Sequence, residues 1–231
     1  MATVPLRLYD DLSEMPTAGE RFLIPGYGLG AVIEAQLDTA KASARASLGH
    51  PPIGVVCHPH PLHGGTLTNK VAHTVAKTFA ELGVETLRFN FRGVGESQGE
   101  FDHGVGEVED LQAAVNWMRE HYPGAPLWLA GFSFGAYVAL SGHKQATADR
   151  LLLVAPPVAM FKFPADAGVE IPWCVIQGSD DEIVESSQVI SWAKRQPRVP
   201  EIYEMEGSGH FFHGRLITLK ENIGAAWGNA L

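Results

Sequence analysis

One serine in this sequence has the surroundings of a catalytic nucleophile. Ser133 is the centre of the run Gly131–Gly135, which reads GFSFG and matches the pattern G-x-S-x-G. The run lies between Leu127–Ala130, predicted as a strand, and Ala136–Leu140, predicted as a helix. A serine on such a sharp turn points its hydroxyl out of the sheet, next to the amide donors and positive dipole of a helix N-terminus. We therefore expect a nucleophile here, the alternative being an ordinary serine at a glycine-rich junction.

This strand–serine–helix arrangement resembles the α/β-hydrolase superfamily, which places its catalytic serine, acid and histidine in that order along the chain. The resemblance implies an acid in Gly178–Val184, where Asp181 matches the family pattern G-x-x-D-x-x-V and Asp180 is the alternative. It implies a general base after the last predicted strand, where His210 follows a glycine-rich loop. His213, at the start of the last predicted helix, is the alternative base.

A second distinctive stretch, His58–Gly65, reads HPHPLHGG and follows a predicted strand. In the family, the loop at this place supplies one backbone N–H of the oxyanion hole, and the residue after the nucleophile, here Phe134, supplies the other. Because Pro61 has no N–H, the resemblance leaves His60 or Leu62 as the loop donor.

Three histidines in this loop, His58, His60 and His63, also suggest a metal site and hence a metal-dependent hydrolase. No carboxylate lies nearby in sequence to complete a zinc site, and the adjacent Cys57 lies inside a predicted apolar strand. We therefore expect no metal and, because water completes hydrolysis of an acyl-enzyme, no cofactor.

Longer motifs narrow the resemblance to a small bacterial subgroup of dienelactone-hydrolase-like serine hydrolases. They are HPHPLHGG at His58–Gly65, LRFNFRGVG at Leu87–Gly95 and GEFDHG at Gly99–Gly104. Dienelactone hydrolase itself uses a cysteine nucleophile, whereas this chain has Ser133, so dienelactone specificity is not implied. The resemblance implies hydrolysis of a small carboxylic ester or thioester; a hydrolase-fold binding protein without turnover is the alternative.

The elements that must position these residues alternate regularly from Ile53 onward. The predicted strands are Ile53–Cys57, Val84–Phe91, Pro126–Gly131, Arg150–Val154, Ile171–Ile176 and Glu201–Met205. The predicted helices are Thr66–Leu82, Glu107–Tyr122, Phe134–His143, Ser186–Arg195 and Arg215–Trp227. Such alternation predicts an α/β fold, with a mostly parallel sheet covered by helices on both faces.

The first fifty residues differ from the rest. Arg21–Ile24 and Ala31–Leu37 are predicted strands without a helix between them, and Thr39–Ser47 is a predicted loop. We expect residues 1–50 to add an antiparallel edge to the core formed by residues 53–231, in a single domain spanning residues 1–231.

The substrate pocket is expected to be open, because only sixteen residues separate the predicted strands ending at Val154 and beginning at Ile171, where related enzymes insert a lid. This interval is too short for a helical lid domain, so short, soluble acyl esters are the expected substrates. The apolar residues best placed to line the pocket are Met160, Phe161, Phe163, Phe211 and Phe212. Phe161 and Phe163 could instead pack the loop onto the sheet.

Composition excludes several classes of partner. The 231 residues carry a net charge of −9 without a basic run, which disfavours nucleic acid. Met1–Pro5 lacks a basic leader segment, and no apolar run approaches the roughly 18 residues of a membrane span. The two cysteines, Cys57 and Cys174, lie in apolar strands, as in reduced cytoplasmic proteins. We expect a cytoplasmic monomer or homodimer acting on a small ester, with no membrane or nucleic-acid partner.

Overall fold

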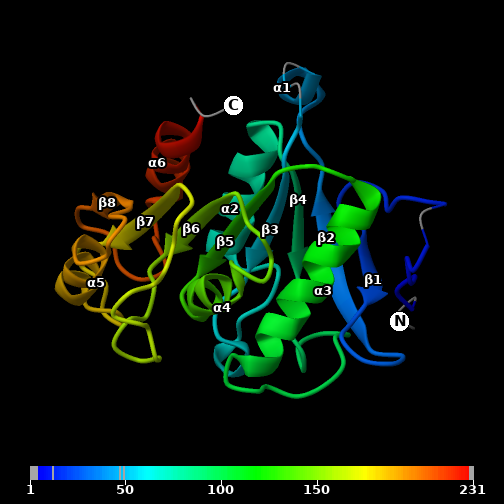
Figure 1. Ribbon diagram of the computed structural model, residues 1–231, viewed down its shortest axis with the longest axis horizontal. Coiled ribbons are helices and arrows are strands. Elements are labelled where there is room, and N and C mark those ends of the chain that lie inside the picture. Colours follow the sequence, from blue (N-terminus) through cyan, green and yellow to red (C-terminus); the bar gives the residue numbers. More distant parts are fainter. Residues whose placement is uncertain (1–4, 12, 47, 49, 229–231) are drawn as a thin grey trace.

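An eight-stranded sheet forms the centre of the computed structural model (Figure 1), which describes residues 5–11, 13–46, 48 and 50–228. The strands are β1 (Arg21–Pro25), β2 (Val32–Asp38), β3 (Ile53–Cys57), β4 (Glu85–Phe89), β5 (Leu127–Phe132), β6 (Arg150–Val154), β7 (Trp173–Gly178) and β8 (Glu201–Met205). Their order in the sheet is β1-β2-β4-β3-β5-β6-β7-β8. Strands β3 to β8 pair in parallel, whereas β1–β2 and β2–β4 are antiparallel. The mostly parallel sheet and its antiparallel N-terminal edge are confirmed.

Helices cover both faces of this sheet (Figure 1). One face is covered by α3 (Val105–His121), α4 (Phe134–Gly142) and α5 (Ser186–Lys194), and the other by α2 (Lys70–Glu81) and α6 (Leu216–Trp227). Helix α1 (Ala42–Ala46) and the short 3-10 helix η1 (Pro61–His63) have no buried residues. Alternate strand residues face opposite layers: Leu129 packs with α3, α4 and α5, and its neighbour Trp128 packs with α2 and α6. Both layers are apolar, which is why the central strands are continuous hydrophobic runs.

Two segments differ from the sequence-based expectation. The predicted loop Thr39–Ser47 contains helix α1, none of whose residues is buried, so it has no apolar stripe to mark it; Ser47 itself lies outside the described residues. Helix α2 begins at Lys70 rather than Thr66, because the Asn69 side chain accepts hydrogen bonds from the backbone and caps the helix there.

The segment between β6 and β7, residues 155–172, is described throughout and forms neither helix nor strand, so the chain has no large lid at this place. Within the described residues, no helix combines the length and apolarity needed to cross a bilayer. Residues 1–4, on which the expectation of no leader segment partly rested, lie outside the described part of the chain.

Candidate active site

Ser133 occupies a strained turn between β5 and α4. Its backbone has φ 54° and ψ −121°, in the left-handed half of conformational space, and its N–H donates to the carbonyl oxygen of Val154 at 2.8 Å. Both flanking glycines are required by close contacts. A Cβ on Gly131 would lie 2.0 Å from the carbonyl oxygen of Gly135, and one on Gly135 would lie 2.3 Å from that of Cys57. The GFSFG run therefore reflects the packing of this turn against β3.

Three side chains from the carboxyl ends of parallel strands meet at this turn. His210 Nε2 lies 3.0 Å from the hydroxyl oxygen of Ser133, and His210 Nδ1 lies 2.8 Å from Oδ2 of Asp181. Ser133 follows β5, Asp181 follows β7 and His210 follows β8. The imidazole is almost fully buried and packs against the ring of Phe132 at 5.1 Å. This is the hydrogen-bond geometry in which a histidine can take a proton from a serine.

Asp181 is held as an acceptor on both carboxylate oxygens. Oδ1 accepts the backbone N–H groups of Ile183 at 2.9 Å and Val184 at 2.7 Å, while Oδ2 accepts Nε2 of the buried Gln177 at 3.0 Å as well as His210. Burial alone would raise the pKa of Asp181, but the hydrogen bonds and charge of His210 and the two amides lower that pKa below its ordinary value. The carboxylate is therefore ionised at neutral pH.

The alternative acid and base do not reach the serine. The Asp180 side chain is exposed and accepts a hydrogen bond from the Ser179 hydroxyl at 2.7 Å. His213 is exposed too, in the turn before α6, where its ring lies 5.8 Å from that of Phe211. The structure thus brings Asp181 and His210, not these neighbours, to Ser133.

Two residues that support the histidine were not anticipated from the sequence. Gln177 fixes the Asp181 carboxylate, and Oε2 of Glu182 accepts the backbone N–H of His210 at 3.0 Å. Each lies within four positions of Asp181, and the one signal in the sequence was a polar Gln177 directly after the predicted apolar strand Ile171–Ile176. Glu182 lies in an acidic run, where nothing distinguishes it from a solvated carboxylate.

Of the three residues expected to form the oxyanion hole, the structure is compatible with Phe134 and His60 but not with Leu62. Phe134 is the first residue of α4, so its N–H has no acceptor within the helix. His60 lines the cavity beside Ser133. Leu62 is a correction: its N–H donates to Nδ1 of His60 at 3.2 Å, and its side chain is 69% exposed and outside the cavity. In the turn of η1 the Leu62 N–H is already bonded to the neighbouring imidazole, so of the two expected loop donors His60 is the remaining candidate.

His58 belongs to the core rather than to a metal site. It is fully buried, its Nε2 accepts the backbone N–H of Phe91 at 3.0 Å, and its Nδ1 donates to the carbonyl oxygen of Pro59 at 2.6 Å. Both ring nitrogens are thus used within the protein. Across the described residues, no three His, Cys, Asp or Glu side chains are grouped so that they could hold one metal ion. The described part of the chain thus shows no ligand set for the metal-dependent alternative.

The buried His58 gives a testable pH dependence of stability. Burial lowers the pKa of His58 to about 4, whereas a histidine in the unfolded chain titrates near 6.5. Between these values the unfolded state binds a proton that the folded state does not, so folding stability falls as pH decreases from 6.5 to 4 and levels off below. In His58→Gln this contribution is absent. The stability advantage of wild type over the variant should shrink by about 3 kcal/mol over this range in urea unfolding; an advantage independent of pH would contradict this assignment.

A cavity of about 250 Å³ opens directly beside Ser133. It is lined by Pro59, His60, His63, Gly64, Gly65, Asn69, Ser133, Phe134, Pro157, Met160, Phe161, Ile183, His210 and Phe211. Of the expected apolar residues, Met160, Phe161 and Phe211 therefore line it. Phe161 also stacks on Tyr137 with ring centroids 5.0 Å apart, so it both packs its loop down and forms part of the cavity wall.

Phe163 and Phe212 are corrections. The N–H of Phe163 donates to the carbonyl oxygen of Phe161 at 2.8 Å, and this tight turn directs the Phe163 ring to Trp192, 5.3 Å away and outside the cavity. Phe212 is fully buried in the layer formed with α2 and α6. Adjacent residues of this loop point in opposite directions, so Phe211 reaches the cavity and Phe212 the core.

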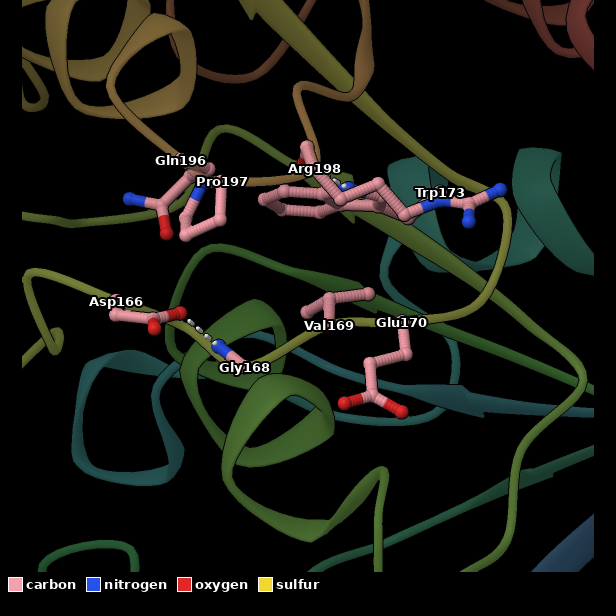
Figure 2. A pocket seen from close by; sticks show the side chains of 8 residues that line it. All are labelled: Asp166, Gly168, Val169, Glu170, Trp173, Gln196, Pro197 and Arg198. Atoms are coloured by element: carbon pink, nitrogen blue, oxygen red, sulfur yellow. Dashed lines mark hydrogen bonds between the residues drawn. The ribbon is translucent and has the colours of Figure 1, made fainter.

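A larger hollow, of about 390 Å³, lies elsewhere on the molecule (Figure 2). Trp173, the first residue of β7, and Arg198, shortly before β8, both line it, so it is at the amino ends of the strands. Figure 2 shows Asp166 accepting the backbone N–H of Gly168, at 2.7 Å. Ser133, Asp181 and His210 all follow the carboxyl ends of strands, whereas this hollow lies at the amino ends, so the two places are separate.

Comparisons with known proteins identify relatives of this chain. A model of the family described as serine aminopeptidase S33 matches residues 52–167 of the chain. An uncharacterized protein of Rickettsia prowazekii is 38% identical over 179 residues, which is 73% of this chain and 75% of that protein. Residues 52–167, which the family model matches, contain the loop at His58–Gly65 and the turn at Ser133.

Two solved structures match nearly the whole chain. The crystal structure of a lidless α/β serine hydrolase from Xanthomonas campestris shares 36% identity, covers 99% of this chain and 98% of its own, and has a TM-score of 0.86. An α/β serine hydrolase homologue from Coxiella burnetii shares 42% identity, covers 93% of this chain and 100% of its own, and has a TM-score of 0.84.

Proposed function

The chain belongs to the α/β-hydrolase superfamily of serine hydrolases, and on that premise we propose that it hydrolyses small carboxylic esters or thioesters through an acyl-enzyme on Ser133. The observation that carries the proposal is the unbroken line of hydrogen bonds from Ser133 through His210 to Asp181, at the wall of a largely apolar cavity. A scaffold that only binds ligands has no need of such a line.

In the proposed mechanism, Ser133 attacks the ester carbonyl while His210 Nε2 takes the hydroxyl proton. His210 then delivers this proton to the departing alcohol or thiol, and Asp181 orients the imidazole and stabilises its charged form. The backbone N–H groups of Phe134 and His60 hold the negative charge of the tetrahedral intermediate. Water, activated by His210, releases the acid from Ser133 and restores the enzyme.

The cavity lining supports an ester over an N-terminal peptide substrate. An aminopeptidase has to bind the α-ammonium group of its substrate, and a carboxylate is the side chain that does this best. None of the residues lining the cavity, all of which the structure describes, is Asp or Glu. The exposed Met160, Ile183 and Phe211 at its mouth instead favour an uncharged, partly apolar group.

We also propose a cytoplasmic location. Cys57 and Cys174 are free, buried thiols on opposite faces of the sheet, and burial raises the pKa of each. The two cysteines are not placed to form a disulfide with each other. Free, buried thiols of this kind are typical of proteins in a reducing compartment.

A substrate panel tests the proposed function. We expect acetyl and butyryl p-nitrophenyl esters and the matching thioesters to be hydrolysed faster than octanoyl and dodecanoyl esters, because the cavity is small and has no lid. Alanine p-nitroanilide should not be cleaved. Release of p-nitrophenol, thiol or p-nitroaniline is measured with Ser133→Ala as the blank. Cleavage of the anilide without the esters, or a steep rate increase above the solubility limit of the dodecanoyl ester, would overturn the proposal.

A further inference from the structure

We propose that the substrate carries an oxygen acceptor in addition to its scissile carbonyl, and that the side-chain amide of Asn69, together with the imidazole of His60, binds this acceptor. The inference rests on the proposed function and narrows its substrate class to esters with a keto, carboxylate or similar oxygen close to the scissile bond. It follows from how the two side chains are fixed by the backbone.

Asn69 presents a donor to the cavity because its acceptor is already used. The backbone N–H groups of Val71 and Ala72 approach one atom of its side-chain amide at 2.9 and 3.2 Å. Two N–H donors can converge only on the carbonyl oxygen, so this contact identifies Oδ1 and leaves Nδ2 as the free end. Asn69 is half-buried and lines the cavity, and Nδ2 has no hydrogen-bond partner in the part of the chain that the structure describes.

His60 presents a second donor for the same kind of reason. Its Nδ1 accepts the N–H of Leu62 at 3.2 Å, so the neutral ring carries its proton on Nε2. Burial, followed by the nearby His63 and His103, lowers the pKa of His60, which favours this neutral form at pH 7. The ring is held by Phe101 and Phe134, with centroids 4.8 and 5.0 Å away. A neutral imidazole in this fixed orientation is a directed hydrogen-bond donor.

The cavity therefore offers two side-chain donors beyond the backbone N–H groups assigned to the oxyanion hole. The backbone N–H groups of Phe134 and His60 account for the oxyanion, yet the Nδ2 of Asn69 and the Nε2 of His60 remain. No carboxylate among the lining residues competes for them. Beyond its scissile carbonyl, a plain alkyl ester has only the weakly accepting alkoxy oxygen, so it leaves these donors to water. An added oxygen acceptor satisfies them, which is the arrangement that gives polar discrimination between substrates.

Capping of α2 is the other role open to Asn69, and two substitutions separate the two roles. Asn69→Asp retains the oxygen that caps the helix and adds a charge that a helix N-terminus favours, but it replaces the donor by an acceptor. Asn69→Ser is also a good cap and withdraws the donor from the cavity without adding charge. Asn116→Asp, on the exposed face of α3, is the matched control for the change from amide to acid.

The test compares isosteric ester pairs that differ in one keto oxygen. On the acyl side the pair is p-nitrophenyl levulinate and p-nitrophenyl isocaproate; on the alcohol side it is acetonyl butyrate and isobutyl butyrate. Wild type should favour the keto member of one pair in kcat/KM. That preference should fall roughly three- to tenfold in Asn69→Ser and further in Asn69→Asp, with the Tm of both variants close to that of wild type. Asn116→Asp should keep the wild-type preference.

Two results would overturn the inference while leaving the proposed function intact. One is Ser133-dependent hydrolysis of both pairs without a preference for either keto member. The other is a preference that both Asn69 variants retain, with a lowered Tm that reveals capping alone. If wild type hydrolyses no ester in either pair, the proposed function fails and the inference fails with it.

Discussion

Replacing Ser133 with alanine is expected to lower kcat for the best ester by about 10⁴–10⁶-fold, the largest effect of any single substitution in this chain. The reason is that Ser133 supplies the oxygen that forms the acyl-enzyme, and no other hydroxyl in the described residues lies within hydrogen-bond distance of His210 Nε2. The variant should remain folded, because alanine keeps the Cβ that Ser133 already has in this turn and loses only the hydroxyl. Initial rates with p-nitrophenyl acetate measure the loss.

Ser141→Ala is the matched control, since Ser141 is an exposed serine on the same helix, α4. For the base, His210→Ala should approach the loss seen with Ser133→Ala, whereas His213→Ala should leave kcat near that of wild type, because His213 lies outside the hydrogen-bonded line. Members of one catalytic unit are not additive, so the double variant Ser133→Ala with His210→Ala should be no slower than the worse single variant. Wild-type turnover in Ser133→Ala would exclude the mechanism.

Asp181→Asn is expected to lower kcat by about 10³–10⁴-fold. Asparagine is isosteric, but its amide carries no charge and can present an N–H where Oδ2 now accepts from His210 Nδ1. The imidazole would then be stabilised in the wrong tautomer, with its proton on Nε2, and could not accept the proton of Ser133. Its charged form would also lose the carboxylate that balances it.

Asp180→Asn provides a control one residue away, with the same chemical change on an exposed side chain. We expect its kcat to stay within about twofold of wild type, as for other surface substitutions. Steady-state kinetics on both variants, with circular dichroism to verify folding, show which of the two aspartates is the catalytic acid. A large loss in Asp180→Asn with little loss in Asp181→Asn would move the acid by one position.

What the sequence could predict depended on whether a residue's role is set locally. The Ser133 turn was predictable because the glycines that permit it are its own neighbours in sequence, at Gly131 and Gly135. The parallel sheet was predictable because buried strands are continuous apolar runs. Helix α1 was not, since none of its residues is buried and no periodic pattern marks it.

Roles set by tertiary contacts could not be predicted. Gln177 supports the site because β7 places its side-chain amide within hydrogen-bond distance of Asp181. Phe163 lies outside the cavity because a tight turn follows Phe161 and directs the next ring away. Leu62 was expected as an oxyanion donor, but in the η1 turn its N–H donates to the His60 ring instead. Asn69 was not anticipated, because the helix was predicted to begin at Thr66, and its place in the cavity wall depends on where α2 begins relative to Ser133.

The most direct test of the central claim is intact-protein mass spectrometry of the enzyme quenched in acid during turnover of p-nitrophenyl butyrate. We expect a fraction of the protein to gain the mass of one butyryl group, and peptide mapping to place that group on Ser133. The adduct should be absent from Ser133→Ala and present in Ser141→Ala. Rapid hydrolysis by wild type with no adduct on Ser133, and with turnover retained in Ser133→Ala, would contradict an acyl-enzyme mechanism at this site.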